Sequence, residues 1–130
     1  MTRKDLEQIY YLNRELRLYE QELARIRARS LVSSPVGGGA KGGAPSDRVA
    51  QRAERTILLE QRISERKDEI QRLRDEAVQF ISDIPDSLTR LVVYKRCVAL
   101  MSWRRVAYEV GGDNTEENVR QIYSRFMRSL

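Results

Sequence analysis

The sequence predicts an all-α protein, and three observations lead to this fold class. Apolar residues recur every three or four positions over two long stretches, which is the spacing of one face of a helix. A Gly-rich run separates the two stretches, and Pro85 ends the second one. We therefore expect a long antiparallel, coiled-coil-like helical hairpin in residues 1–84, followed by a small three-helix helix-turn-helix domain in residues 85–130.

The first predicted helix runs from Thr2 to about Ser30. Charged residues of both signs lie between its apolar positions, as on a solvated helix face. The expected buried stripe consists of Ile9, Leu12, Leu16, Tyr19, Leu23 and Ile26.

Residues 32–46, VSSPVGGGAKGGAPS, form the predicted linker. The run is rich in Gly, Ser and Pro and has little apolar surface to bury, so we expect a flexible connection. Its glycines precede Lys41, but the spacing of a phosphate-binding loop is missing and no strand comes before it. A linker is therefore the better interpretation.

The second predicted helix starts near Ser46 or Asp47, either of which can cap it, and ends near Asp83. Arg66 falls on the apolar seam and indicates a partly wet or register-setting contact. The first helix, another subunit, or both must cover a seam of this length, and we expect a homo-oligomer formed through the hairpin. The predicted stripe consists of Val49, Ala53, Thr56, Leu59, Ile63, Ile70, Leu73, Ala77, Phe80 and Ile84.

Three short helices are predicted after Pro85. The first is capped by Asp86 or Ser87 and ends near Leu100. Its expected face is Leu88, Leu91, Val92, Lys95 and Val98.

The last two helices resemble a helix-turn-helix. Ser102 caps one helix, the pair Gly111 and Gly112 ends it, and Asn114 or Thr115 caps the final helix. Trp103 is expected to be a core anchor rather than a ligand-binding residue. The expected inner positions are Trp103, Val106, Ala107 and Val110 on the first helix, and Val119, Ile122, Tyr123 and Phe126 on the second.

Polar side chains fill the outward face of the final helix. Glu117 can accept a hydrogen bond from a cytosine amine, and Gln121 can pair with adenine through two hydrogen bonds. Arginines on this helix and its predecessor suit contacts to phosphates. The competing interpretation is that these side chains are only the solvated surface of a small bundle. The candidate DNA-binding residues are Thr115, Glu117, Asn118, Arg120, Gln121, Ser124, Arg125, Arg104 and Arg105, with Arg128 a further phosphate candidate.

The run TEENVRQI, from Thr115 to Ile122, resembles the recognition helix of region four of bacterial primary sigma factors. The resemblance covers 30 to 40 residues and implies phosphate contacts for Thr115 and Arg120 and base contacts for Glu117 and Gln121. Glu116 and Asn118 stand where those sigma factors usually carry Arg. Promoter specificity therefore does not carry over.

The order of segments over the whole chain is similar to that of small phage and prophage proteins with a sigma-like C-terminal helix-turn-helix. These are related to the late-gene transcriptional activators of phages that infect Gram-positive hosts. The resemblance implies transcriptional control. Arg104 and Arg105 replace the acidic pair that normally follows the Trp, which adds positive charge beside the predicted reading helix.

Composition narrows the functions further. The chain has a net charge of +5, and residues 86–130 carry eight basic and five acidic side chains, which favours an anionic partner. With no His and one cysteine, Cys97, we expect no metal site, no cofactor, no disulfide and no enzymatic activity. The first 17 residues lack a signal-peptide pattern, and we expect the cytoplasm of a bacterial host cell.

Three hypotheses follow for the partner. The first is a regulator that binds double-stranded DNA, with RNA polymerase as a further candidate partner and no membrane or small-molecule substrate. The second is a small terminase-like packaging protein, although such proteins usually place the DNA-binding unit first. The third is an adaptor that binds RNA polymerase or a sigma factor without reading DNA, favoured if Asp113, Glu116 and Glu117 make the helix start too acidic for a duplex.

Overall fold

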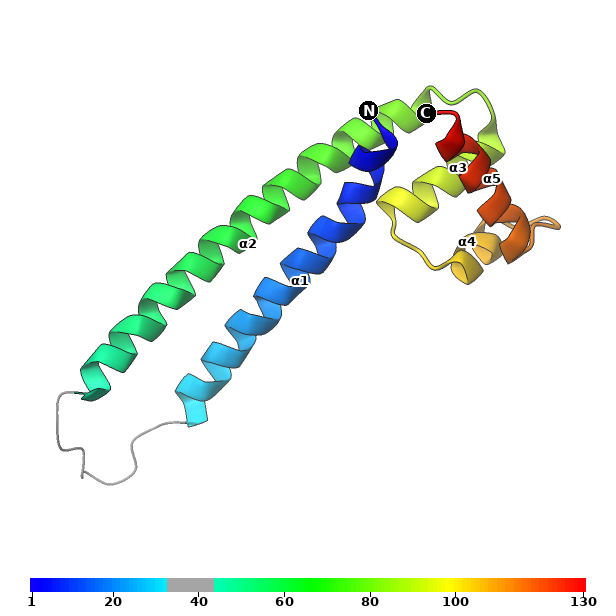
Figure 1. The fold of residues 1–130 in the computed structure, drawn as a ribbon. Helices are drawn as coiled ribbons and strands as arrows, with labels where there is room; N and C mark the ends of the chain where they lie inside the picture. The colour runs from blue at the N-terminus through cyan, green and yellow to red at the C-terminus, as the bar shows by residue number, and fades with distance from the viewer. Residues whose placement is uncertain (33–43) are drawn as a thin grey trace. The chain divides into compact units, whose positions relative to one another are not determined.

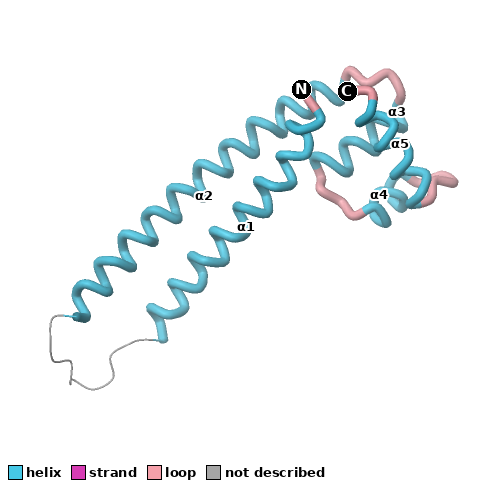
Figure 2. Tube along the Cα trace, viewed as in Figure 1, coloured by secondary structure: helices cyan, strands magenta, loops and turns pink. Residues whose placement is uncertain are grey.

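The computed structural model describes residues 1–32 and 44–130, with the side chains of residues 30–46 left out. Every regular element in the described residues is a helix, which confirms the predicted all-α class (Figures 1 and 2). Most of the predicted linker 32–46 lies outside the described residues. The elements are α1 (Arg3–Val32), α2 (Ala44–Ser82), α3 (Ser87–Val93), the π-helical segment η1 (Tyr94–Val98), α4 (Trp103–Val110) and α5 (Glu116–Arg128).

The chain divides into two compact units. Unit 1 consists of Met1–Leu12 and Glu69–Leu130, and unit 2 consists of Asn13–Asp68. Unit 1 therefore contains the start of α1 and the end of α2 together with the three short helices. The domain boundary between residues 84 and 85 stays a prediction.

Unit 2 is an antiparallel pair of helical segments. Leu23 and Ile26 of α1 pack with Leu59 of α2 in one small apolar cluster. Arg66 lies on the seam as predicted, and its Nε donates a 3.0 Å hydrogen bond to the carboxylate of Glu15. This pair is partly exposed, so its main effect is to fix the register of the two helices rather than to add much stability.

The predicted start of α2 and the first part of its stripe were wrong. The helix begins at Ala44, before both proposed capping residues. Val49 and Ala53 are exposed, and Val49 retains 64% of its accessible surface. The buried stripe of α2 begins only at Leu59, where Leu23 and Ile26 of α1 cover it.

Unit 1 has a core to which the start of α1 contributes directly. Leu6 and Ile9 are almost completely buried. They pack with Ala77, Ile81 and Ile84 of the α2 end, and with Val93, Cys97, Val98 and Met127 from the short helices. The first turns of α1 are therefore part of the packing that supports the C-terminal helices.

A second core cluster of unit 1 joins the three short helices to one another. Val92 of α3, Val106 of α4 and Val119 of α5 are each fully buried. Trp103, Ala107, Val110, Ile122 and Tyr123 pack around them, as the sequence predicts. Each helix contributes one β-branched side chain, and their mutual contact fixes how α4 and α5 cross.

The third helix differs from the prediction. The helix predicted to end near Leu100 is α-helical to Val93 and continues directly as one π-helical segment, η1, to Val98. Leu91, predicted to face inward, is 45% exposed. Val92 and Val93 pack into different clusters on two sides of α3, and this moves the buried face away from Leu91.

No helix among the described residues combines the length and apolar composition that a bilayer span requires.

Candidate nucleic-acid interface

The α4–turn–α5 segment of unit 1 is built by capping groups at each boundary. The hydroxyl of Ser102 accepts a hydrogen bond from the backbone N–H of Arg105 at the start of α4. Thr115, confirmed as the cap of α5, accepts one from the N–H of Asn118 at 3.1 Å. These bonds satisfy donors that have no partner within a helix and fix where each helix begins.

Two glycines make the turn between the helices. Gly111 has φ +74° and ψ −157°, and Gly112 has φ +62°. Positive φ values are readily adopted only by glycine. Asn114, which sequence reasoning named only as a possible cap, donates a 3.0 Å hydrogen bond to the carbonyl of Gly111 and accepts one from the side chain of Asn118. It therefore braces the turn against α5.

Four of the candidate polar side chains share the face of α5 opposite its core. Glu117, Gln121, Ser124 and Arg128 recur at intervals of four, three and four residues and are all exposed. The amide of Gln121 donates a 3.3 Å hydrogen bond to the carboxylate of Glu117. The two predicted base readers therefore lie together, with donor and acceptor groups that can turn toward a base edge.

The predicted phosphate contacts are partly engaged within the protein. Arg120 forms a 3.8 Å ion pair with Glu116, one turn back on α5. Arg105 pairs with Glu109 at 2.8 Å, and Lys95 reaches the same carboxylate at 3.7 Å. Arg120 and Arg105 are themselves exposed, and ion pairs of exposed side chains are worth at most about 1 kcal/mol, so a phosphate can displace these two. Arg104 is exposed and has no ion pair among the described residues.

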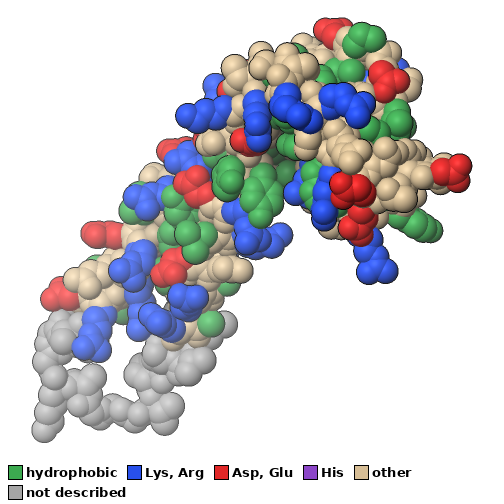
Figure 3. Space-filling model, turned by 45° about the vertical axis from the view of Figure 1, so that its right-hand side comes forward, with side chains coloured by type: hydrophobic (Ala, Val, Ile, Leu, Met, Phe, Trp, Pro, Cys, Tyr) green, Lys and Arg blue, Asp and Glu red, His purple; other side chains and the backbone are tan. Residues whose placement is uncertain are grey.

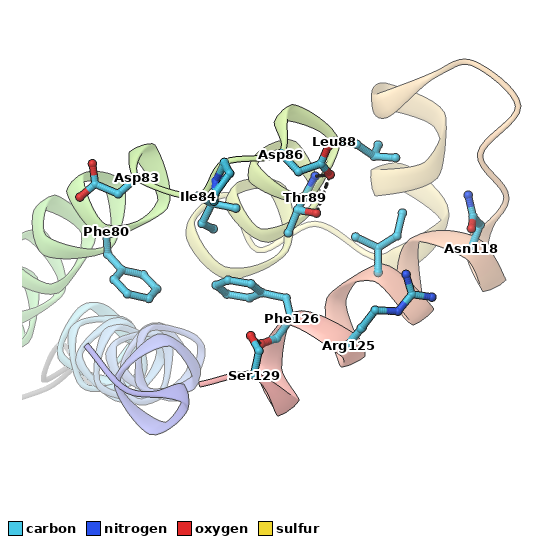
Figure 4. Close-up of a pocket in the computed structure, with 12 residues that line it drawn as sticks. Phe80, Asp83, Ile84, Asp86, Leu88, Thr89, Asn118, Arg125, Phe126 and Ser129 are labelled. Carbon is cyan, nitrogen blue, oxygen red and sulfur yellow. Dashed lines mark hydrogen bonds between the residues drawn. The ribbon is translucent and has the colours of Figure 1, made fainter.

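Asn118 and Arg125 lie on a different side of α5. They line a groove of about 860 Å³ between α5, the end of α2 and the start of α3 (Figure 4). Phe80 and Phe126 face each other across it, with ring centroids 6.3 Å apart. The nine candidate residues therefore do not form one surface. Glu117, Gln121 and Ser124 share the outer face of α5, Asn118 and Arg125 border this groove, Arg104 and Arg105 lie on α4, Thr115 caps α5, and Arg120 pairs with Glu116.

The charge of the interface is mixed. Glu116 and Glu117 occupy the first turn of α5, where the helix dipole favours carboxylates, and Arg125 and Arg128 occupy its last turn. On the face of the molecule seen in Figure 3, basic and acidic side chains are likewise interspersed along the helices. Affinity for phosphate would therefore come from single arginines rather than from a broad basic patch.

Buried Cys97 and partly buried Tyr123 contact each other beneath the interface. The thiol of Cys97 donates a 3.8 Å hydrogen bond to the hydroxyl of Tyr123. Burial raises the pKa of Cys97 to about 11 and also raises the pKa of Tyr123. Both groups stay protonated at neutral pH, as expected for a cysteine that acts as a small hydrophobic residue.

Comparison with known proteins gives no relative: no family model matches the chain, and no curated protein or solved structure matches it. Within the described residues, no three His, Cys, Asp or Glu side chains gather in a way that could hold a metal ion.

Proposed function

We propose that the protein is a DNA-binding transcriptional regulator of phage or prophage origin, with α5 as the helix that reads the major groove. The observation that carries the proposal is the α4–glycine turn–α5 unit, held by the contact of Val106 with Val119. This unit leaves a face of hydrogen-bonding side chains exposed on the second helix. A helix-turn-helix presents its recognition helix to DNA in this way.

The side chains on α5 have separate roles in this proposal. Glu117 and Gln121 read base edges, because one accepts and the other both accepts and donates hydrogen bonds. Arg120 binds a phosphate after leaving Glu116, and the hydroxyl of Thr115 donates to another phosphate while it accepts from Asn118. Arg104 and Arg105 extend these contacts along the flanking backbone.

We also propose that the regulator acts as a homo-oligomer in the bacterial cytoplasm. Exposed apolar side chains on the paired helices of unit 2 support this part of the proposal. Leu18, Ile57 and Leu58 each keep between 44% and 61% of their surface exposed. A second copy that covered them would make a dimer, the form in which many helix-turn-helix regulators bind DNA.

An adaptor that binds RNA polymerase or a sigma factor is the second candidate. The apolar groove bordered by Phe80, Phe126 and Ile122 favours it, because such a groove accepts an amphipathic helix. In this case Asn118 and Arg125 would contact protein rather than DNA.

Selection of bound duplexes from a random pool separates the two candidates. A regulator enriches one sequence, and its affinity for that sequence falls as salt rises, with a slope of about −0.9 per phosphate contacted. If no duplex is retained at low salt, the DNA-binding proposal is wrong and the adaptor is favoured.

A further inference from the structure

A smaller pocket of unit 1, outside the candidate DNA face, has no part in the proposed function. Its volume is about 340 Å³, and it is enclosed by the start of α1, by η1 and the residues that follow it, and by one aromatic residue each from α4 and α5. The side chains that define its chemistry are Glu7, Tyr10, Tyr11, Arg96, Trp103 and Tyr123.

Aromatic rings line the pocket as two pairs. Tyr10 and Tyr11 form an edge-to-face pair with centroids 5.3 Å apart, and Trp103 and Tyr123 form another at 5.1 Å. The α1 pair is not part of the core, since Tyr10 and Tyr11 are 46% and 62% exposed. Large rings kept exposed beside a concavity provide flat surfaces on which a planar ligand can stack.

Two opposite charges lie among these rings. The guanidinium of Arg96 stacks over the ring of Trp103 at 4.3 Å and donates one hydrogen bond to the carbonyl of Met101. A guanidinium has five N–H donors, so Arg96 keeps others for a ligand. Glu7 receives a hydrogen bond from Arg3 on one carboxylate oxygen, and the other oxygen retains acceptor capacity.

The backbone below the pocket is irregular. Arg96 and Cys97 belong to η1, and Leu100 has φ +57°, a left-handed conformation that costs a non-glycine residue about 1–2 kcal/mol. Single π-helical turns and strained residues are concentrated at functional sites. Arg96, within this segment, and Leu100, just after it, both line the pocket.

We propose that this pocket binds a guanine base, supplied by a mononucleotide or by an unpaired guanine in a single strand. The base stacks on the exposed ring of Tyr11, beside the Arg96–Trp103 pair. Guanine fits the two charges because its N1 and N2 groups donate to a carboxylate, and its O6 and N7 atoms accept from a guanidinium. Adenine lacks this arrangement, since it presents no carbonyl oxygen to Arg96 and no ring N–H to Glu7.

The experiment uses Trp103, the single tryptophan of the chain, as the reporter. Guanosine monophosphate is titrated against the full-length protein, and adenosine monophosphate is the matched comparison. We expect saturable quenching of Trp103 fluorescence, with guanosine monophosphate bound at least about tenfold more tightly. Equal affinity for both nucleotides, or no saturable change up to about 10 mM, overturns the proposal.

Substitutions then test the pocket itself. Tyr11→Ala should weaken guanosine monophosphate about tenfold, because a stacking ring is lost. Tyr108→Ala is the matched control, since Tyr108 is 85% exposed and does not line the pocket. Glu7→Gln should remove the preference for guanine over adenine while stacking is retained. Equal effects of the two tyrosine variants, at unchanged helical content, contradict the assignment.

A short single-stranded oligonucleotide with one guanine identifies the source of the base. If the oligonucleotide binds more tightly than guanosine monophosphate, and guanosine monophosphate displaces it, the guanine comes from a nucleic acid strand. Otherwise the natural ligand is the free nucleotide. Duplex selection does not depend on Tyr11, so this proposal and the DNA-binding proposal can fail separately.

Discussion

Replacement of Gly111 by alanine should destabilise unit 1 through the backbone alone. The φ of +74° and ψ of −157° at Gly111 fall in a region that is essentially restricted to glycine. A Cβ at this position would have no atom within 4 Å, so the substitution causes no collision. The whole effect therefore measures the conformational strain of the turn between α4 and α5.

The magnitude follows from two opposing contributions. A residue other than glycine is destabilised by about 1–3 kcal/mol in such a conformation. The upper end of this range applies to Gly111, because its region of φ and ψ is essentially restricted to glycine. Alanine also lowers the conformational entropy of the unfolded chain, which stabilises the folded protein by about 0.4–1 kcal/mol. We expect Gly111→Ala to lower the free energy of unfolding by about 2 kcal/mol.

Gly112→Ala is the matched control. Gly112 has φ +62°, where alanine is strained by about 1–2 kcal/mol, and its Cβ would meet only the Asn114 amide at an ordinary 3.6 Å. Its net cost should be about 0.5 kcal/mol. Guanidinium denaturation followed by Trp103 fluorescence reports on unit 1 in both variants. Equal costs, or a cost below about 0.5 kcal/mol for Gly111→Ala, would refute this account of the turn.

Three further predictions concern the cores and the titrating groups. Leu6→Ala should cost about 2–5 kcal/mol of unfolding free energy because Leu6 is fully buried, whereas Leu18→Ala, at a 61% exposed position, should cost less than about 0.5 kcal/mol by the same denaturation assay. The hydrogen bond from Tyr19, followed by the one from Arg66, lowers the pKa of Glu15, so the ionised carboxylate stabilises the fold above the unfolded pKa of 4.5 and this stabilisation is lost as the pH falls below it. Glu15→Gln should therefore flatten the decline of unfolding free energy between about pH 5 and pH 3. An unchanged slope would count against the Glu15–Arg66 and Glu15–Tyr19 contacts. Cys97, with its pKa raised to about 11 by burial, should react with an aromatic disulfide reagent at pH 8 only after denaturant is added, and rapid labelling of the native protein would show that the core is open.

Periodicity and capping chemistry made the C-terminal module predictable. Val106 and Val119 follow a helical repeat, and Ser102 and Thr115 are good N-caps, so the order and faces of α4 and α5 could be read from the sequence. A polar contact at Arg66 was also predictable, because a charged residue on an apolar seam requires a polar partner. In the structure this partner is Glu15.

Long-range packing was not predictable in the same way. Leu6 lies one turn before the expected stripe of α1, and its burial depends on contacts with the α2 end and the short helices. Met127 falls beside the expected inner face of α5 and is buried by the same cluster. The π-helical turn η1 has no local sequence signal, and it determines which side chains follow Val93 into the core.

The sequence predicted which residues belong to the candidate site, but not how these residues are arranged on the surface. Spacing placed Glu117 and Gln121 on one face, and the structure brings their side chains into a hydrogen bond. The position of Arg125 beside a groove depends on where α2 ends relative to α5, which no local pattern specifies. The aromatic pocket escaped notice because Tyr10 and Trp103 are far apart in the chain.

The most direct test of the central claim is the affinity of Gln121→Ala and Arg120→Ala for the selected duplex and for a scrambled one, at several salt concentrations. Both side chains are exposed, so helical content should not change. Gln121→Ala should lose about 1–3 kcal/mol on the selected duplex and relax the preference at one base pair. Arg120→Ala should weaken both duplexes equally and reduce the salt slope by about one unit. If both variants bind like the wild type, α5 does not read DNA, and the proposed function is wrong.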